Sequence, residues 1–278
     1  MRAITLSRFV FSICLLIAGL SFYPAKARDL DLIRTYSCGA FTLSFMPLFE
    51  TQAAPDAPDG AVVLLAELQQ GKTVLYKFDI DQEPHLRTSC RDVTGDGVPE
   101  LHVVTFSGGA HCCFVHYVFT PAGHVRLLAR IYTGDGGPLR FIQLNGRGPL
   151  EAIMSYPFLP YTYASFAETA FLPHVFALVN GRYADASRCF PSVLQGFAAR
   201  HNEHTTSAAV TRLAAALVRG DGQAVQRLLA TAPEDSRGII TRLLPEFRQD
   251  LHTYGMSTWS DGAFKAQPVG GPDCQQLR

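Results

Sequence analysis

The segment RDVTGDGVPELHVVTFSGGAHCCF, residues 91–114, carries the strongest local signals in this chain. Oxygen-bearing side chains occupy alternate positions in its first part, and the glycines between them permit the left-handed backbone of a sharp turn. The apolar run LHVVTF that follows is typical of a β-strand. The segment therefore predicts a tight acidic loop that leads into a strand and is followed by two adjacent cysteines.

The acidic loop is a candidate calcium site. Ca²⁺ takes roughly six to eight oxygen ligands, and alternating positions of one turn can supply them. The candidate ligands are the side chains of Asp92, Thr94, Asp96 and Glu100 and the backbone carbonyl of Val98. Three carboxylates this close repel one another unless a cation lies between them, which favours an occupied site. The alternative is an acidic β-turn with solvated side chains.

The loop and strand together resemble a known repeat. The stretch DVTGDGVPELHVV is similar to the calcium loop and following strand of FG-GAP or VCBS repeats, which are found in integrin-alpha-type β-propellers and in many exported bacterial proteins. The repeat pattern D-x-[D/N/T]-x-D-G-x-x-[D/E], followed by apolar residues, is matched by Asp92, Thr94, Asp96, Gly97, Glu100 and Leu101. The resemblance implies a propeller-like β fold and a bound calcium ion.

A second, degenerate copy of the loop occurs at residues 143–152, with the sequence QLNGRGPLEA. It aligns with the first copy at an interval of 51 residues, which lies in the range of propeller blades. Gln143 and Arg147 replace the two aspartates, so we expect no metal in this copy. Arg147 is instead expected to neutralise Glu151 internally. The alternative is a chance similarity between two glycine-containing turns.

The distribution of apolar residues divides the mature chain in two. Short apolar runs separated by Gly, Pro, Asn or Asp cover residues 28–190, whereas residues 191–278 change to helical spacing. We therefore expect a mainly β fold, with a propeller-like or sandwich antiparallel body and a small α-helical C-terminal appendage, α+β overall. At the 51-residue interval the body has room for three units, fewer than the four blades that a propeller usually needs.

The helical part is predicted to begin near Ser192 and to end near Tyr254. Apolar residues at positions i, i+3, i+4, i+7 and i+8 from Val210 form one stripe of an amphipathic helix. Gly220 is expected to end this helix and Asp221 to cap the next one. The candidate N-caps of the helix that contains Val210 are Thr205, Thr206 and Ser207.

Residues 1–27 are predicted to be a secretory signal peptide. Arg2 and Arg8 precede the apolar run from Phe9 to Leu20, and the stretch Ala25-Lys26-Ala27 has the small-x-small pattern of a cleavage site. The apolar run is shorter than the roughly 20 residues that cross a bilayer. The mature chain is therefore expected to begin near residue 28 and to be exported, to the periplasm or the medium.

The mature chain is expected to be mildly acidic. Three of the 24 basic residues lie in the predicted signal peptide, so 21 basic and 24 acidic residues remain and the formal charge is −3. This charge offers no electrostatic footprint for nucleic acid. Later apolar runs are short and broken by Gly or Pro, so we expect no membrane span after signal removal.

The cysteines of the mature chain are predicted to form disulfides, because their number is even and the compartment is oxidising. Their pairing cannot be chosen from the sequence. Neighbouring Cα atoms lie about 3.8 Å apart, so Cys112 and Cys113 are expected to have separate partners. A strained vicinal bond and a thiolate metal site are the alternatives. The candidates are Cys38, Cys90, Cys112, Cys113, Cys189 and Cys274.

The aromatic stretch SYPFLPYTYASF, residues 155–166, has two interpretations. An exposed rim could bind sugar rings or a peptide, with Tyr156, Phe158, Tyr161 and Tyr163 as candidate ligand-binding residues. Alternating aromatic residues also suit a buried strand face, and this core interpretation is favoured.

No catalytic residue is assigned from the sequence. The pair His201 and His204 lacks the spacing of a metalloprotease motif. The favoured function is a non-catalytic exported module, stabilised by calcium and disulfides, that binds an extracellular or envelope protein or a glycan. The alternatives are a secreted hydrolase or lyase with an unrecognised active site, and a structural envelope protein that docks through its helical tail.

Overall fold

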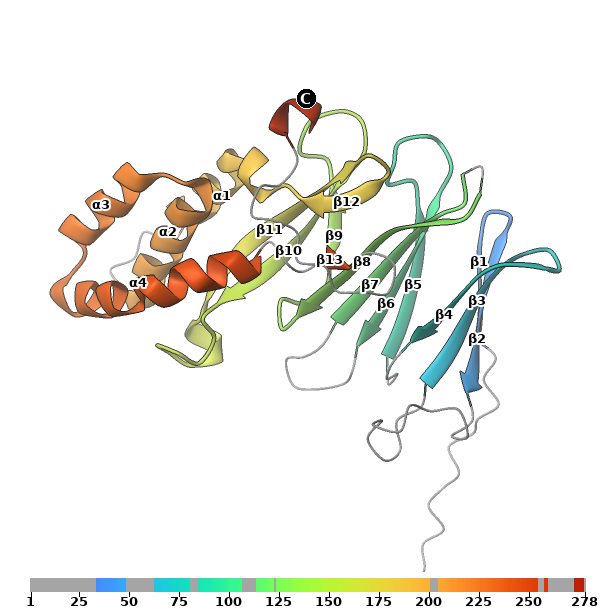
Figure 1. The fold of residues 1–278 in the computed structure, drawn as a ribbon, viewed down its shortest axis with the longest axis horizontal. Helices are drawn as coiled ribbons and strands as arrows, with labels where there is room; N and C mark the ends of the chain where they lie inside the picture. Colours follow the sequence, from blue (N-terminus) through green and yellow to red (C-terminus); the bar gives the residue numbers. More distant parts are fainter. Residues whose placement is uncertain are drawn as a thin grey trace, which may run out of the picture. The chain divides into compact units, whose positions relative to one another are not determined.

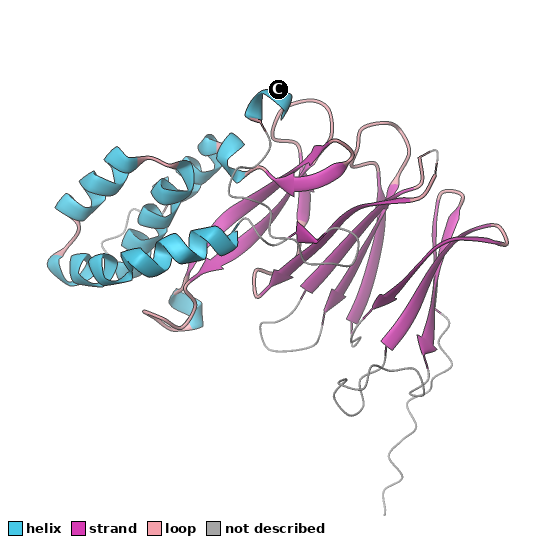
Figure 2. Ribbon diagram, viewed as in Figure 1, coloured by secondary structure: helices cyan, strands magenta, loops and turns pink. Residues whose placement is uncertain are grey.

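The computed structural model describes residues 34–48, 63–80, 85–106, 114–122, 124–200, 205–254, 258–259 and 273–277. The predicted signal peptide, the pair Cys112 and Cys113, and the histidines at 201 and 204 lie outside the described residues. Contacts unite the chain from Ile33 onward in one unit. Strands and helices occupy separate parts of this unit (Figure 2).

The described strands form three antiparallel sheets (Figure 1). The first sheet contains β1 to β4, the second β5 to β8 with β13 at one edge, and the third β9 to β12. Within each sheet the consecutive strands pair in chain order, which makes every sheet a meander. The bounds are β1 Arg34–Cys38, β2 Phe41–Leu48, β3 Val63–Gln70, β4 Thr73–Ile80, β5 His85–Arg91, β6 Glu100–Phe106, β7 Phe114–Thr120, β8 Arg126–Gly134, β9 Arg140–Ile142, β10 Glu151–Phe158, β11 Ala170–Val179, β12 Arg182–Asp185 and β13 Thr258–Trp259.

Turn chemistry explains the hairpin between β11 and β12. Asn180 and Gly181 connect the two strands and have φ angles of 51° and 77°. Two consecutive positive φ angles define the type I′ turn, whose twist matches that of the flanking strands. An Asn-Gly pair accepts this conformation because both residues tolerate the left-handed region.

The sheets bury their faces against one another in chain order. Neighbouring residues of a strand point to opposite faces, so in β7 Tyr117 and Phe119 pack in the core shared with the first sheet, whereas Val118 packs in the core shared with the third. The first core contains Leu43, Phe45, Ala66, Leu68, Leu101, Val103, Tyr117 and Phe119. The second contains Val118, Ile131, Leu139, Ala152, Met154 and Phe176.

Four described helices follow the third sheet; α1, α2 and α4 contact its strands, whereas α3 packs on α2 and α4. They are α1 Pro191–Ala199, α2 Thr206–Arg219, α3 Gly222–Thr231 and α4 Glu234–Tyr254. The Thr205 side chain caps α2, Gly220 ends it in the left-handed conformation, and Asp221 caps α3. Leu172 of β11 lies in one core with Leu213 of α2. No helix within the described residues is long and apolar enough to cross a membrane.

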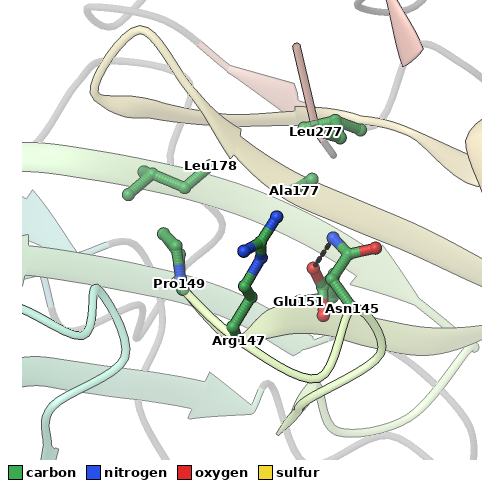
Figure 3. A pocket seen from close by; sticks show the side chains of 8 residues that line it. Asn145, Arg147, Pro149, Glu151, Ala177, Leu178 and Leu277 are labelled. Atoms are coloured by element: carbon green, nitrogen blue, oxygen red, sulfur yellow. Dashed lines mark hydrogen bonds between the residues drawn. The ribbon is translucent and has the colours of Figure 1, made fainter. Parts of the chain in front are cut away.

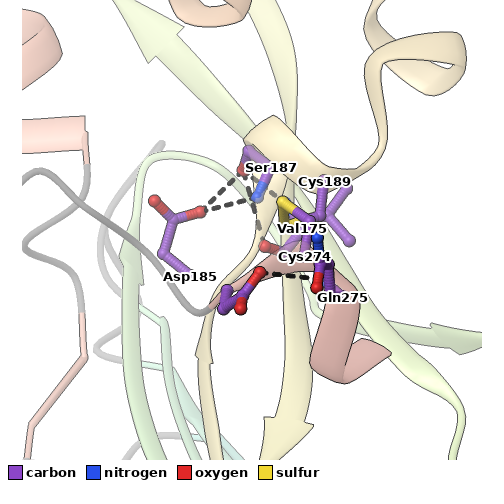
Figure 4. The surroundings of a disulfide bond; sticks show 7 residues. Val175, Asp185, Ser187, Cys189, Cys274 and Gln275 are labelled. Carbon is purple, nitrogen blue, oxygen red and sulfur yellow. Dashed lines mark hydrogen bonds between the residues drawn. A yellow bond between two sulfur atoms is a disulfide. The ribbon is translucent and has the colours of Figure 1, made fainter. Parts of the chain in front are cut away.

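Two disulfides join distant parts of the described chain. Cys38 of β1 pairs with Cys90 of β5, which links the first and second sheets across 52 residues of sequence. Cys189, just before α1, pairs with Cys274 near the end of the chain across 85 residues (Figure 4). The prediction of disulfides is confirmed for these four cysteines. The expected mainly β body with a helical C-terminal part, α+β overall, is also confirmed.

Candidate functional site

Two hairpin loops repeat the same backbone arrangement. The first loop, residues 92–99, is closed by the strand pair Arg91 and Glu100, and the second loop, residues 143–150, by the pair Ile142 and Glu151. The second pair follows the first by the same 51 residues that separate the two sequence copies. The two segments are therefore similar in backbone structure as well as in sequence.

The aspartates of the first loop hold its backbone. Asp92 accepts the N–H of Gly95 on Oδ1 at 2.6 Å and the N–H of Gly97 on Oδ2 at 2.9 Å. Asp96 accepts the N–H of Val98 on Oδ1 at 2.8 Å. A carboxylate has about four lone-pair sites, so each aspartate retains acceptor capacity beyond these bonds.

Buried glutamates anchor both loops in the same way. Glu100, 1 % exposed, accepts the N–H groups of Val93 and Thr94 on Oε2 at 2.8 and 3.1 Å. Glu151, 3 % exposed, accepts the Leu144 N–H on Oε2 at 2.7 Å and the Asn145 side-chain amide on Oε1 at 2.7 Å. Because the copy that lacks the aspartates keeps this arrangement, the glutamate has a structural role in both loops.

The two loops lie side by side. The Leu150 N–H of the second loop donates to the Val93 carbonyl of the first at 2.8 Å. The Tyr183 hydroxyl of β12 lies 3.0 Å from the Leu150 carbonyl oxygen and 3.4 Å from that of Val93. Burial raises the pKa of Tyr183, and the nearby Glu100 and Glu151 carboxylates raise it further. The phenol therefore stays protonated and donates a hydrogen bond between the loops.

The contact between the loops leads to a testable difference between two glycines. Gly95 and Gly97 have φ angles of 78° and 84°, where alanine costs about 1–2 kcal/mol. A Cβ on Gly95 would also lie 3.3 Å from the Gly148 carbonyl oxygen, whereas a Cβ on Gly97 would meet no atom within 4 Å. Denaturant unfolding should therefore show a larger loss of stability for Gly95→Ala than for Gly97→Ala. Equal losses would contradict the loop contact.

The first loop has the donor chemistry of a calcium site, but its carboxylates are not gathered into one cluster. Asp92, Thr94, Asp96 and the Val98 carbonyl supply hard oxygen donors, while Glu100 points to backbone N–H groups. Among the described residues, no three His, Cys, Asp or Glu side chains form a group that could hold a metal. Calcium binding at this loop stays a prediction.

The second loop differs from expectation in one respect. Arg147 forms no ion pair with Glu151 among the described residues, because the Glu151 carboxylate points inward to Leu144 and Asn145. The Arg147 side chain is exposed and extends away from the loop backbone (Figure 3). The Gln143 side chain donates to the Gly148 carbonyl at 3.0 Å and so closes the loop in place of an aspartate.

The aromatic candidates are dispersed between core and surface. Phe158 is fully buried among residues of the helices, and Tyr156 packs against the same core. The Tyr163 hydroxyl accepts the Ala170 N–H at 2.5 Å. Tyr161 is 64 % exposed and lies beside Phe166. Of the four candidates, Tyr161 alone presents most of its ring to solvent.

A buried polar network near β11 gave no signal in the sequence. The Asp185 Oδ1 atom accepts the Ser187 hydroxyl at 2.8 Å and lies 3.1 Å from His174 Nε2. Burial would raise the pKa of Asp185, but His174 and Ser187 outweigh this effect and hold the pKa below its usual value. The carboxylate stands between serine and histidine, so this is not a nucleophile activated by a histidine base.

Sequence reasoning also missed a histidine pair in which His116 is buried and His102 is partly buried. His102 Nε2 of β6 lies 3.0 Å from His116 Nδ1 of β7, and the two rings are stacked. Burial lowers the pKa of His102 to about 4 and holds the pKa of His116 well below its usual value. Neutral histidines in this position act as structural hydrogen-bonding groups.

Comparisons with protein family models, curated proteins and solved structures found no match to this chain.

Proposed function

We propose that the protein is an exported, non-catalytic binding module of the FG-GAP or VCBS type, in which calcium at the first loop and disulfides stabilise a set of loops that binds a protein or glycan. The observation that carries the proposal is the pair of adjacent loops with one backbone arrangement and different charges. The anchoring glutamate is common to both, so the aspartates give the first loop two carboxylates that the second loop does not have.

The charge of the first loop supports a cation there. Asp92, Asp96 and Glu100 lie within nine consecutive residues, and none of them forms an ion pair within the described part of the chain. In the second loop the corresponding positions are Gln143, Arg147 and Glu151, which leave a single carboxylate. A cation at the first loop would remove a repulsion that the second loop does not have.

Contacts that the same loop position makes with the preceding sheet support the repeat assignment. Pro99, near the end of the first loop, contacts the β1–β2 turn of the preceding sheet, where the Cys38 sulfur lies 3.7 Å from the Pro99 carbonyl oxygen. Leu150, at the corresponding position of the second loop, bonds to Val93 of its own preceding sheet. Meanders that contact the previous sheet through the same loop position are the relationship expected of propeller blades.

The calcium part of the proposal predicts one site that depends on the aspartates. Titration of the mature protein by calorimetry should give one calcium ion per chain, and Asp96→Ala should abolish it because it removes a carboxylate that lies on the exposed side of the loop. Calcium at about 100 times its dissociation constant should raise the free energy of unfolding by about 2.7 kcal/mol.

The second loop supplies the control. Gln143 occupies the position that corresponds to Asp92, so Gln143→Ala should leave calcium binding unchanged whereas Asp92→Ala should abolish it. Circular dichroism of each variant would verify that the sheets are retained. Normal calcium binding by Asp96→Ala, or no binding by the unaltered protein, would refute the calcium site.

A further inference from the structure

A cavity of about 510 Å³ lies beside the second loop (Figure 3). The loop forms one wall, β11 forms another, and the C-terminal segment held by the Cys189–Cys274 disulfide contributes Leu277. The volume is within the range of about 300–1,000 Å³ that is typical of sites for small ligands. The lining residues are Asn145, Arg147, Gly148, Pro149, Glu151, Ala177, Leu178 and Leu277.

Arg147 is the cationic side chain of this lining. Its guanidinium extends between Leu178 and Asn145 toward Ala177 (Figure 3). Among the described residues, no hydrogen bond or ion pair forms with it, and the Glu151 carboxylate is already bonded to the loop. A guanidinium presents a planar fork of N–H donors that matches a carboxylate. The cavity thus contains a cation available for an anionic ligand.

The apolar part of the lining is aliphatic. The apolar lining residues are Pro149, Ala177, Leu178 and Leu277, and no aromatic residue is part of the described lining. Sugar sites commonly use aromatic faces for stacking, so this wall suits an aliphatic group better than a sugar ring. The buried Glu151 carboxylate nearby disfavours a ligand with two negative charges. One carboxylate with an adjoining aliphatic group fits both conditions.

We propose that this cavity binds the C-terminal carboxylate of a peptide partner whose last residue is aliphatic. Arg147 would bind the carboxylate, and the aliphatic wall would accept the side chain. The inference rests on the proposed function, because it names the class of partner that the binding module recognises. Metal titration tests the calcium loop and peptide titration tests this cavity, so failure of one proposal can be told from failure of the other.

The test uses acetyl-Ala-Ala-Leu with a free C-terminal carboxylate and the same peptide with a C-terminal amide. Ligand-observed NMR titration of the mature protein should give a dissociation constant on the order of 1 mM or lower for the acid. The amide should bind roughly tenfold more weakly, because it loses a charge-assisted hydrogen bond. Arg147→Ala should reduce binding of the acid to the level of the amide, with Arg147→Lys intermediate.

Matched controls make each outcome decisive. Arg140 is an exposed arginine of β9 outside the lining, so Arg140→Ala should bind the acid normally. Equal binding of acid and amide, undiminished binding by Arg147→Ala, or no binding of either peptide would overturn the proposal. If N-acetyl-leucine binds as tightly as the tripeptide, the proposed peptide partner is wrong and the ligand is a small free acid. A protein preparation that binds calcium but does not bind the peptide acid would refute this cavity assignment and leave the proposed function standing.

Discussion

Removal of the Cys38–Cys90 disulfide is expected to lower the free energy of unfolding by about 4 kcal/mol. The bond closes 52 residues of sequence, and a crosslink of this length restricts the unfolded chain by about that amount. The effect should be concentrated in the first sheet, because its described core is shared with the second sheet alone. Urea unfolding of a Cys38→Ala, Cys90→Ser double variant would measure the loss.

Hydrogen exchange would locate the weakened region. Amides of β2 and β3 should exchange faster in the double variant, whereas those of β10 and β11 should keep most of their protection, because the third sheet also packs against the helices. A Cys189→Ala, Cys274→Ser variant is the matched control, since that bond lies beside the third sheet. Loss of protection spread evenly over all three sheets would contradict a local role for Cys38–Cys90.

Local sequence signals were sufficient for much of the fold. The structure selects Thr205 from the three candidate N-caps, and Gly220 and Asp221 end and cap the helices as predicted, because capping chemistry acts over a few residues. The paired loops followed from glycine spacing, because positive φ angles at fixed positions determine the turn. By contrast, no apolar run in the sequence indicates β5. Its sequence HLRTSCR is mostly polar, and only its pairing with β6 makes it a strand.

Features that depend on long-range packing could not be predicted from the sequence. Which cysteines pair depends on how β1 and β5 are brought together, and no local pattern encodes that contact. The predicted ion pair between Arg147 and Glu151 was wrong for the same reason, because the hairpin backbone sets the direction of the Glu151 side chain. The aromatic stretch was ambiguous because Phe158 and Tyr161 differ in burial, not in residue type.

The histidine pair between β6 and β7 adds a strong dependence of stability on pH. The His102 ring stacks on His116 and meets the edge of Phe141, and its Nδ1 lies 3.5 Å from the Ser89 hydroxyl. On the other side, His116 Nε2 accepts the Leu139 N–H at 3.3 Å. If His116 Nε2 bound a proton, it could no longer accept the Leu139 N–H. The described surroundings therefore favour the neutral form of both rings.

Stability is expected to fall as the pH is lowered from about 6.5 to about 4. In this range an unfolded histidine, with a pKa near 6.5, binds a proton, whereas folded His102, with a pKa of about 4, does not. The unfolded state therefore binds more protons, and acid favours unfolding. His102 alone accounts for a loss of roughly 3 kcal/mol, which is complete below its folded pKa. His116, whose pKa is lowered by burial and by His102, adds in the same direction.

Urea unfolding at pH 7, 6, 5 and 4 would measure this slope, and two variants would assign it. His102→Gln removes one titrating ring but can still bond to His116, so its stability should depend less on pH across this range. His124→Gln, at an exposed histidine, should leave the slope of the unaltered protein unchanged. The lowered pKa of Asp185 acts below about 3.8 and so lies outside the window. A His102→Gln variant with the full acid sensitivity would exclude this pair as its cause. A smaller slope in His102→Gln would assign the acid sensitivity between pH 6.5 and pH 4 to the histidines between β6 and β7.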